Sequence, residues 1–313
     1  MFSYFIRRLL TAIPVMLVVA LSVFLLLRLA PGDPATIIAG EMANPEQVAN
    51  IRRALGLDEP LLTQFLLWIS NLLHGDFGTS LISQTSVASM ISQRLEPTVS
   101  LAVAAILITV LIAVPLGVIA AWRQGSWIDN LVMSSSVVGF SVPVFVIAYL
   151  LIQVFAIELK WLPVQGFRGL DHGLGEFLSR LVLPALTLAS VYIALIARMT
   201  RASMLEVLRE DYIRTARAKG LSQRVVLFRH ALRNAAVPIL TVVGAGFALM
   251  VSGVVVTESV FNIPGLGRLI VDAVLARDYP VIQALILLTA GLYVVINLLI
   301  DLSYAITDPR IRY

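Results

Sequence analysis

The chain has 313 residues, of which 59% are hydrophobic and only 13% are charged, and its mean hydropathy is +0.92. Soluble globular domains carry about 25% charged residues, so the composition predicts an integral membrane protein. The absence of cysteine from the sequence excludes disulfides and thiolate metal sites. The pI near 9.6 would also suit a nucleic-acid-binding protein. The basic residues lie beside apolar stretches, however, so we attribute them to membrane orientation and expect no nucleic-acid partner.

Six apolar stretches approach or exceed the about 20 residues needed to cross about 30 Å of hydrocarbon. They lie at residues 9–30, 98–122, 131–157, 181–200, 237–257 and 281–306. Their even spread predicts an all-α bundle of six transmembrane helices, and the fourth is short because Arg198 interrupts it. The first stretch is longer than a signal-peptide core and lacks a small-x-small cleavage pattern, so we expect residues 1–30 to be retained as the first transmembrane helix. Four prolines inside the spans are tolerated where neighbouring helices satisfy the exposed carbonyls. They are Pro14, Pro115, Pro143 and Pro184.

Basic residues predict the orientation of the chain. The segments 1–8, 123–130, 198–236 and 301–313 contain 14 Lys and Arg in 68 residues, whereas 31–97, 158–180 and 258–280 contain 8 in 113. An excess of basic residues marks the cytoplasmic side. We therefore expect both termini to be cytoplasmic, with an outer loop or cap at 31–97, a five-helix core at 98–306 and a cytoplasmic tail at 307–313.

Polar residues inside the spans are candidates for lining a path. They are Ser134, Ser135, Ser136, Ser141, Gln153 and Asn297. A hydrogen bond between helices is the simpler explanation for each of them. Glu258, beside the fifth span, and Asp301, near the end of the sixth, are candidate gate or interface residues. Alternatively, they are boundary charges that face water.

Residues 198–236 form a polar insertion with nine Lys and Arg against three Asp and Glu. Within it, residues 206–219 have acidic residues early and basic residues late, an order that suits the dipole of a helix. Gly220 is suited to end this helix, and Ser222 is suited to begin a second one. A basic loop resting on anionic lipid is the alternative. The mixed charges and the glycine between two helices favour docking of a cytosolic protein.

Two finer features of the 206–219 helix are also predicted. Glu210 and Arg214 have the spacing of an i,i+4 ion pair. One face carries an apolar stripe at helical spacing. Its members are Leu205, Leu208, Tyr212 and Ala216.

The 258–280 segment is too polar for a span and too apolar for a free linker. A proline–glycine break near 264–265 precedes renewed helical spacing. Such a segment can fold into the mouth of a path and act as a gate, with Phe261 and Leu266 as the plug. An amphipathic helix lying on the membrane surface is the alternative.

The sequence also limits the energy source. Neither lysine, Lys160 or Lys219, follows a glycine, so the chain has no phosphate-binding P-loop. Ion-coupled carriers place ionisable residues at membrane depth. No Asp, Glu, Lys, Arg or His occurs in 100–122, 131–157, 182–197, 238–257 or 281–300. The three histidines, His74, His172 and His230, lie in predicted loops. We therefore expect no catalytic residue, metal or cofactor in this chain.

These residues resemble the permeases of binding-protein-dependent ABC importers. The family's cytoplasmic signature is Glu-Ala-Ala, three residues, Gly, nine residues, then Ile-x-Leu-Pro. With Gly220 aligned, Ala216 and Leu232 also match. Four residues depart from the signature, namely Arg214, Thr215, His230 and Arg233. The Arg-Thr-Ala-Arg-Ala-Lys-Gly run at 214–220 is usual in the peptide/nickel subfamily.

Further fragments extend the resemblance over nearly the whole chain. They are Pro31-Gly32-Asp33-Pro34, Leu55-Gly56-Leu57-Asp58, Gly75-Asp76-Phe77-Gly78, the 260–267 run, Asp278-Tyr279-Pro280 and Asp308-Pro309-Arg310. The resemblance implies the type I importer fold in a bacterial inner membrane. It implies a second homologous permease, two ATP-binding subunits that hold ATP and Mg²⁺, a periplasmic solute-binding protein and membrane lipid as partners.

The resemblance also implies that 206–220 contains the coupling helix that docks into an ATPase. The implied docking residues are Glu210, Asp211, Tyr212, Arg214, Thr215, Ala216, Lys219 and Gly220. The most strongly implied function is import of dipeptides, oligopeptides or glutathione by a non-catalytic subunit. A membrane-embedded sensor or scaffold that recruits a signalling protein is the alternative. An intramembrane hydrolase would need an acid–base pair in a span, which the sequence lacks.

Overall fold

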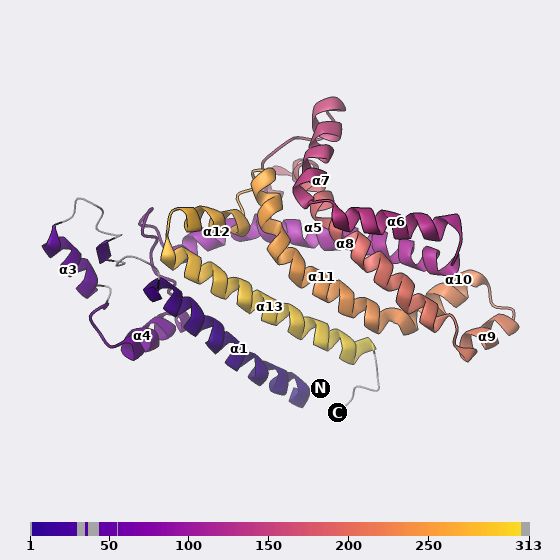
Figure 1. Ribbon diagram of the computed structural model, residues 1–313, viewed down its shortest axis with the longest axis horizontal. Helices are drawn as coiled ribbons and strands as arrows, with labels where there is room; N and C mark the ends of the chain where they lie inside the picture. Colours follow the sequence, from indigo (N-terminus) through magenta and orange to yellow (C-terminus); the bar gives the residue numbers. More distant parts are fainter. Residues whose placement is uncertain (1, 30–34, 37–43, 55, 308–313) are drawn as a thin grey trace. The chain divides into compact units, whose positions relative to one another are not determined.

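The computed structural model describes residues 2–29, 35–36, 44–54 and 56–307, and these residues are almost entirely helical (Figure 1). The helices are α1 (Phe2–Leu29), α3 (Pro45–Ala54), α4 (Leu61–Leu73), α5 (Val87–Trp122), α6 (Trp127–Ser141), α7 (Val144–Leu151), α8 (Leu174–Val207), α9 (Asp211–Ala218), α10 (Gln223–Val225), α11 (Leu232–Val260), α12 (Leu266–Leu275) and α13 (Tyr279–Thr307). Within these ranges no strand forms, and one β-bridge joins Thr79 to Ser86. The 31–34 and 308–310 fragments lie outside the described residues.

The prediction of an all-α membrane protein is confirmed. Among the described residues, five helices are long and apolar enough to cross a membrane, and α6 with α7 and the π-helical segment Ile152–Glu158 makes a sixth candidate. This sixth candidate coincides with the apolar stretch at 131–157 and is bent by 104°, which the apolar pattern did not predict. Val142 is extended at the bend, because a residue before proline avoids the helical conformation, and Pro143 begins the new helix.

Several spans are longer than their apolar stretches predicted, α5 and α8 most of all. α5 begins at Val87 rather than near 98, and its 36 residues correspond to about 54 Å at 1.5 Å per residue. α8 begins at Leu174 and continues to Val207, beyond the apolar stretch at both ends. Hydropathy therefore located the membrane-length part of each helix but not its ends.

Contacts divide the chain into two compact units. The first contains residues 1–5, 96–268 and 295–313, and the second contains 6–95 and 269–294. In the first unit α8 lies at the centre, packed against α6, α7 and α11. One apolar cluster there joins residues of α5, α7, α8 and α11, including the buried Leu101, Leu188 and Met250.

Glycines bring helices of the first unit close together. A Cβ at Gly117 of α5 would lie 2.6 Å from the Ala197 carbonyl oxygen of α8, and one at Gly244 of α11 would overlap Ile300 of α13. Both glycines therefore allow close helix packing within this bundle.

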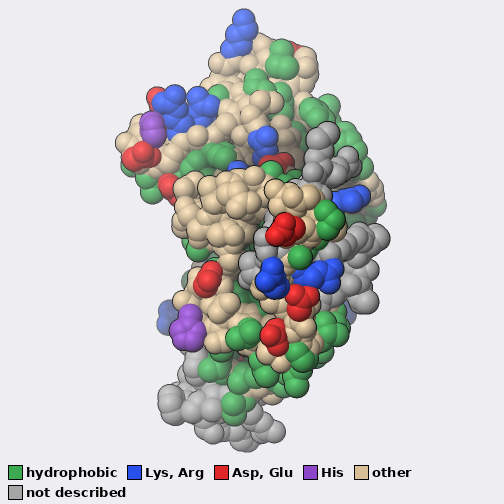
Figure 2. Space-filling model, turned by 90° about the vertical axis from the view of Figure 1, so that its left-hand side faces the viewer, with side chains coloured by type: hydrophobic (Ala, Val, Ile, Leu, Met, Phe, Trp, Pro, Cys, Tyr) green, Lys and Arg blue, Asp and Glu red, His purple; other side chains and the backbone are tan. Residues whose placement is uncertain are grey.

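The second unit has its own packing. Phe24 of α1 contacts Phe65 and Trp68 of α4, with ring centroids 5.1 and 5.6 Å away. Asp278, in the turn before α13, accepts hydrogen bonds from the Ser80 hydroxyl at 2.5 Å and from the Leu81 amide at 3.1 Å. On the face that carries α3 and α4, acidic and basic side chains are interspersed with hydrophobic ones (Figure 2).

Candidate functional site

The predicted docking helix is shorter than expected. α8 continues through Val207, a turn follows, and α9 begins only at Asp211. Glu210 is extended at the start of α9, with φ −66° and ψ 145°, so the helix predicted over 206–219 is two helices separated by a turn. Gly220 follows the capping residue Lys219 at the end of α9 and has φ +77°, which confirms the predicted glycine stop.

One face of α9 is buried. Ile213 is fully buried and Ala216 is 6% exposed, and both belong to an apolar cluster with Val118 of α5 and Met204 of α8. The cluster continues into the segment after Gly220 through the buried Val226. α9 is therefore held by apolar contacts with the ends of two long helices.

The predicted apolar stripe is partly wrong. Ala216, Leu205 and Leu208 do pack in the cluster, but Tyr212 is 41% exposed and Ile213 takes its place. The reason is that the turn at 208–210 resets the helical phase. Partial desolvation raises the pKa of the Tyr212 phenol above its usual value.

The opposite face of α9 is exposed and charged. Arg214 donates to Asp211 at 3.2 Å rather than pairing with Glu210 as predicted. Both side chains are largely exposed, so this pair adds little to stability. The Thr215 hydroxyl donates to the Asp211 carbonyl at 3.0 Å, and Lys219 is exposed at the end of the helix. Of the predicted docking residues, four lie exposed on α9, namely Asp211, Tyr212, Arg214 and Thr215. Ala216 is buried in the apolar cluster, so its prediction as a docking residue is wrong, and Glu210, Lys219 and Gly220 flank the helix.

The second helix predicted after Ser222 is not separate. The chain passes from α10 through a π-helical segment, Val226–Ala231, directly into α11. The Ser222 side chain makes no capping hydrogen bond, although its carbonyl accepts from the Val226 amide at 3.1 Å. The predicted loop at 198–236 therefore contains the end of α8, the short helix α9 and the beginning of α11.

The predicted gate residues differ in exposure. Phe261 is 1% exposed and belongs to the apolar cluster of α5, α7, α8 and α11. Its carbonyl accepts a hydrogen bond from the Gly166 amide at 2.9 Å. Leu266, the first residue of α12, is half-buried. Phe261 is therefore fixed in the core of the first unit, and a plugging role for it remains a prediction.

Glu258 of α11 is fully buried beside the start of α12. Its Oε1 accepts from the Thr98 hydroxyl of α5 at 2.6 Å, and its Oε2 accepts from the Arg268 amide at 2.9 Å. The Thr98 oxygen in turn accepts from the Leu266 amide at 2.8 Å. Two amides at the start of α12, which have no partner inside the helix, are satisfied in this way. We call Thr98, Glu258 and these two amides the carboxylate cap.

The carboxylate cap explains two glycines of the 260–267 run. A Cβ at Gly265 would overlap the Glu258 carboxylate, and one at Gly267 would lie 2.9 Å from Oε2 and 2.8 Å from the Val255 Cα. Neither glycine has a positive φ, so both are required by space rather than by backbone conformation.

The two predicted boundary charges are buried. Glu258 has no exposed surface and Asp301 is only 9% exposed, so neither is a charge that faces water. Long-range contacts account for the burial of Glu258, because Thr98 lies 160 positions away in the sequence. The hydropathy of the sequence around Glu258 could not predict its contact with Thr98.

The predicted path-lining residues are not gathered in one cluster. Ser134 and Ser141 lie exposed on α6, Gln153 lies exposed in the following π-helical segment, and Asn297 lies half-buried on α13. Ser141 donates to the Val137 carbonyl of its own helix at 2.8 Å, and Gln153 donates to Glu158 at 3.1 Å. For Ser141 and Gln153, these bonds lie within one segment rather than between helices. A role in lining a path remains a prediction.

Known proteins resemble the chain over its whole length. The family model for the inner membrane component of binding-protein-dependent transport systems matches residues 113–313, and the model for the N-terminal part of such membrane components matches residues 1–102. A probable peptide ABC transporter permease of Sinorhizobium fredii is 56% identical over 310 residues, covering 99% of both chains.

Two further relatives are similar over the full length. A putative peptide transport system permease of Brucella abortus is 49% identical over 314 residues, and the glutathione transport system permease of Escherichia coli K12 is 46% identical over 313 residues. Each alignment covers 100% of both chains. With its several apolar helices, the chain is a multi-pass inner membrane protein, and it belongs to the family of inner membrane components of binding-protein-dependent transport systems.

Proposed function

We propose that this chain is the membrane-spanning subunit of an ATP-driven importer of small peptides, in the class of dipeptides, oligopeptides or glutathione. It forms the path with a second, homologous permease and takes its substrate from a periplasmic binding protein. Two partner subunits bind ATP and Mg²⁺, and this chain performs no bond chemistry itself. The names of the relatives support the substrate class.

The observation that carries the proposal is the construction of α9. Its buried face anchors it to α5 and α8 through Ile213 and Ala216, and its other face presents Asp211, Arg214 and Lys219. A helix that is firmly held on one side and charged on the other suits docking into a cleft of a soluble subunit. Closure of the ATP-binding subunits would then move α9 together with the ends of α5 and α8.

This proposal places α9 and both termini in the cytoplasm. The parent chain contains no cysteine, so single cysteines at the exposed Gln47 and Arg224 can be labelled with a membrane-impermeant thiol reagent. In intact cells we expect labelling at 47 and not at 224, with labelling at 224 appearing after permeabilisation. Labelling of 224 in intact cells would contradict the orientation.

The function is tested by isolating the tagged chain in mild detergent and identifying what accompanies it. We expect two ATP-binding subunits and a second permease to copurify with it. We also expect the binding protein encoded beside this gene to bind a radiolabelled dipeptide or glutathione. A single regulatory protein, without ATP-binding subunits, would instead support a membrane-embedded sensor or scaffold.

A further inference from the structure

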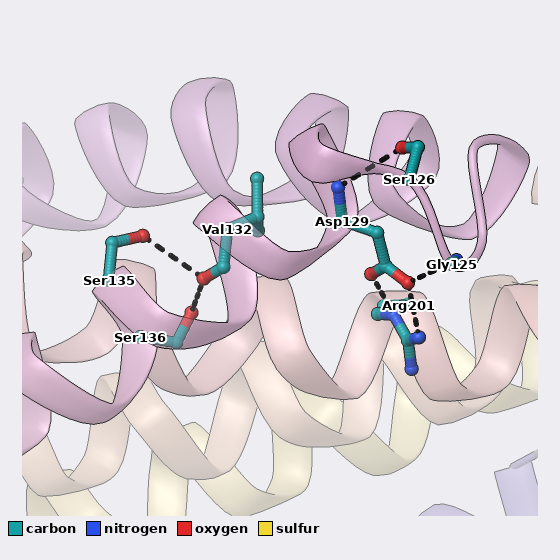
Figure 3. A network of polar contacts seen from close by, with 7 residues as sticks. All are labelled: Gly125, Ser126, Asp129, Val132, Ser135, Ser136 and Arg201. Atoms are coloured by element: carbon teal, nitrogen blue, oxygen red, sulfur yellow. Dashed lines mark hydrogen bonds and ion pairs between the residues drawn. The ribbon is translucent and has the colours of Figure 1, made fainter.

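Arg201 of α8 and Asp129 of α6 form a two-bonded ion pair (Figure 3). The Arg201 Nε donates to Oδ1 at 2.5 Å and Nη2 donates to Oδ2 at 2.6 Å. The Asp129 side chain is 3% exposed and that of Arg201 is 23% exposed. Paired bonds between a guanidinium and a carboxylate fix the relative position of the two groups, beyond simple attraction between charges.

The same carboxylate organises the turn before α6. The Gly125 amide donates to Asp129 Oδ2 at 2.9 Å, and the Asp129 amide donates to the Ser126 hydroxyl at 3.4 Å, where Ser126 caps α6. The nearby hydroxyls of Ser135 and Ser136 donate to the Val132 carbonyl of their own helix (Figure 3). Arg201 therefore holds both the turn and the first residues of α6.

Arg201 lies close to the docking helix along the chain. α8 ends at Val207, Met204 of α8 packs with the buried residues of α9, and the neighbour of Arg201, Thr200, contacts α5 at Gly117. α5 and α6 thus meet α8 at adjacent residues near its end. Arg201 lies fewer than two turns of helix before Val207, so a displacement of α9 that moves the end of α8 would also move Arg201.

We propose that Asp129 and Arg201 are positioning residues that transmit displacement of α9 to α6, and through it to the bent α6–α7 pair. α6 also packs against α5 and α8 through apolar side chains such as Ile128, Val132 and Ile196. The hydrophobic effect has no direction, whereas the two-bonded pair adds a directional contact that fixes the register of α6 on α8. This inference rests on the proposed docking role of α9.

The test follows α6 directly and needs no knowledge of the substrate. Ser141, exposed at the far end of α6, is replaced by cysteine in the assembled complex, with any cysteines of the partner subunits removed. The labelling rate by N-ethylmaleimide is measured with and without a non-hydrolysable ATP analogue. We expect the analogue to change this rate at least about fivefold, the low end of typical coupling between sites.

The pair is then altered in this background. Arg201→Lys keeps a positive charge beside Asp129 but cannot reproduce both bonds, and Asp129→Asn removes the charge. We expect both to abolish the response to the analogue while the ATP-binding subunits still copurify, because α9 is held by Ile213 and Ala216. Asn130→Ala is the matched control, because this side chain is exposed on α6 beside Asp129, and it should leave the response intact.

Three results would overturn the inference. The first is an Arg201→Lys complex in which the ATP analogue still changes the labelling rate at position 141. Arg201→Lys is expected to insert into the membrane even if Asp129→Asn does not. The second is no response in the parent despite bound ATP-binding subunits. The third is loss of those subunits from the Arg201→Lys complex, which would make the pair an assembly contact. If the parent itself never copurifies with ATP-binding subunits, the proposed function fails, and that result is visible without any variant.

Discussion

α9 and the start of α12 are both short helical segments near a glycine, yet they are held in opposite ways. α9 buries two apolar side chains, Ile213 and Ala216, and leaves its charges in water. The start of α12 buries the carboxylate of Glu258 and satisfies it with a hydroxyl and an amide. The first arrangement presents polar groups to a partner, whereas the second uses them to fix the backbone.

The glycines differ in the same way. Gly220 has φ +77° and open space around the position of a Cβ, so its requirement is conformational. Gly265 lacks a positive φ but has the Glu258 carboxylate where a Cβ would lie, so its requirement is steric. Substitutions at these two glycines can therefore test two different requirements. The end of α9 depends on the backbone conformation of Gly220, whereas the start of α12 depends on space for the Glu258 side chain.

The largest effect is expected at the carboxylate cap. Glu258→Ala leaves the Thr98 hydroxyl and the Arg268 amide without this acceptor, and each buried group left unpaired costs about 1–3 kcal/mol. We expect a clear loss of thermal stability of the purified complex, measured by the midpoint of unfolding. The adjacent Ser259→Ala is the control, because that side chain is exposed and donates to the Val255 carbonyl of its own helix. Equal stability of the two variants would show that the cap contributes nothing.

The next effect concerns Gly265. We expect Gly265→Ala to destabilise the complex because its methyl group displaces the Glu258 carboxylate, by about 1–3 kcal/mol as for other overpacked sites. Its cost should shrink when Glu258 is already alanine, because residues in direct contact are not additive. Unfolding midpoints of the two single variants and the double variant measure this coupling. Strictly additive shifts would contradict the steric explanation.

The smallest effect on stability is expected at Gly220. A left-handed conformation costs a residue with a Cβ about 1–2 kcal/mol, while asparagine adopts it more readily. We expect Gly220→Val to lower strongly the ATP hydrolysis that the periplasmic binding protein stimulates, because α9 changes position. We expect Gly220→Asn to retain most of this activity. Similar activity of the two variants, at equal membrane levels, would show that the left-handed turn does not matter.

Local patterns in the sequence were sufficient for several features. The mixed charges and Gly220 predicted a helix with a glycine stop, and the structure has both. Pro143 carried the signal for the bend at 141–144, although it was interpreted only as a proline tolerated within a span. Ile213 was missed because the turn after Val207 shifts the helical phase, which periodicity over one continuous helix cannot show.

The polar contacts could not be predicted from local patterns. Thr98 and Glu258 lie 160 positions apart, and Asp129 and Arg201 lie 72 apart. Each of these residues alone has the appearance of a residue near the end of a span. Their pairing depends on which helices pack together, and apolar periodicity gives the face of a helix but not the identity of its neighbour.

The central claim is that the exposed face of α9 docks into an ATP-binding subunit. A photo-activatable cross-linker attached to a single cysteine at Arg214, which is largely exposed on α9, tests this in the assembled complex. A cysteine at Leu62, exposed on α4, serves as the control. We predict a cross-link from 214 to an ATP-binding subunit and none from 62. An assembled, ATP-hydrolysing complex in which position 214 cross-links only to lipid or to another permease would contradict the account.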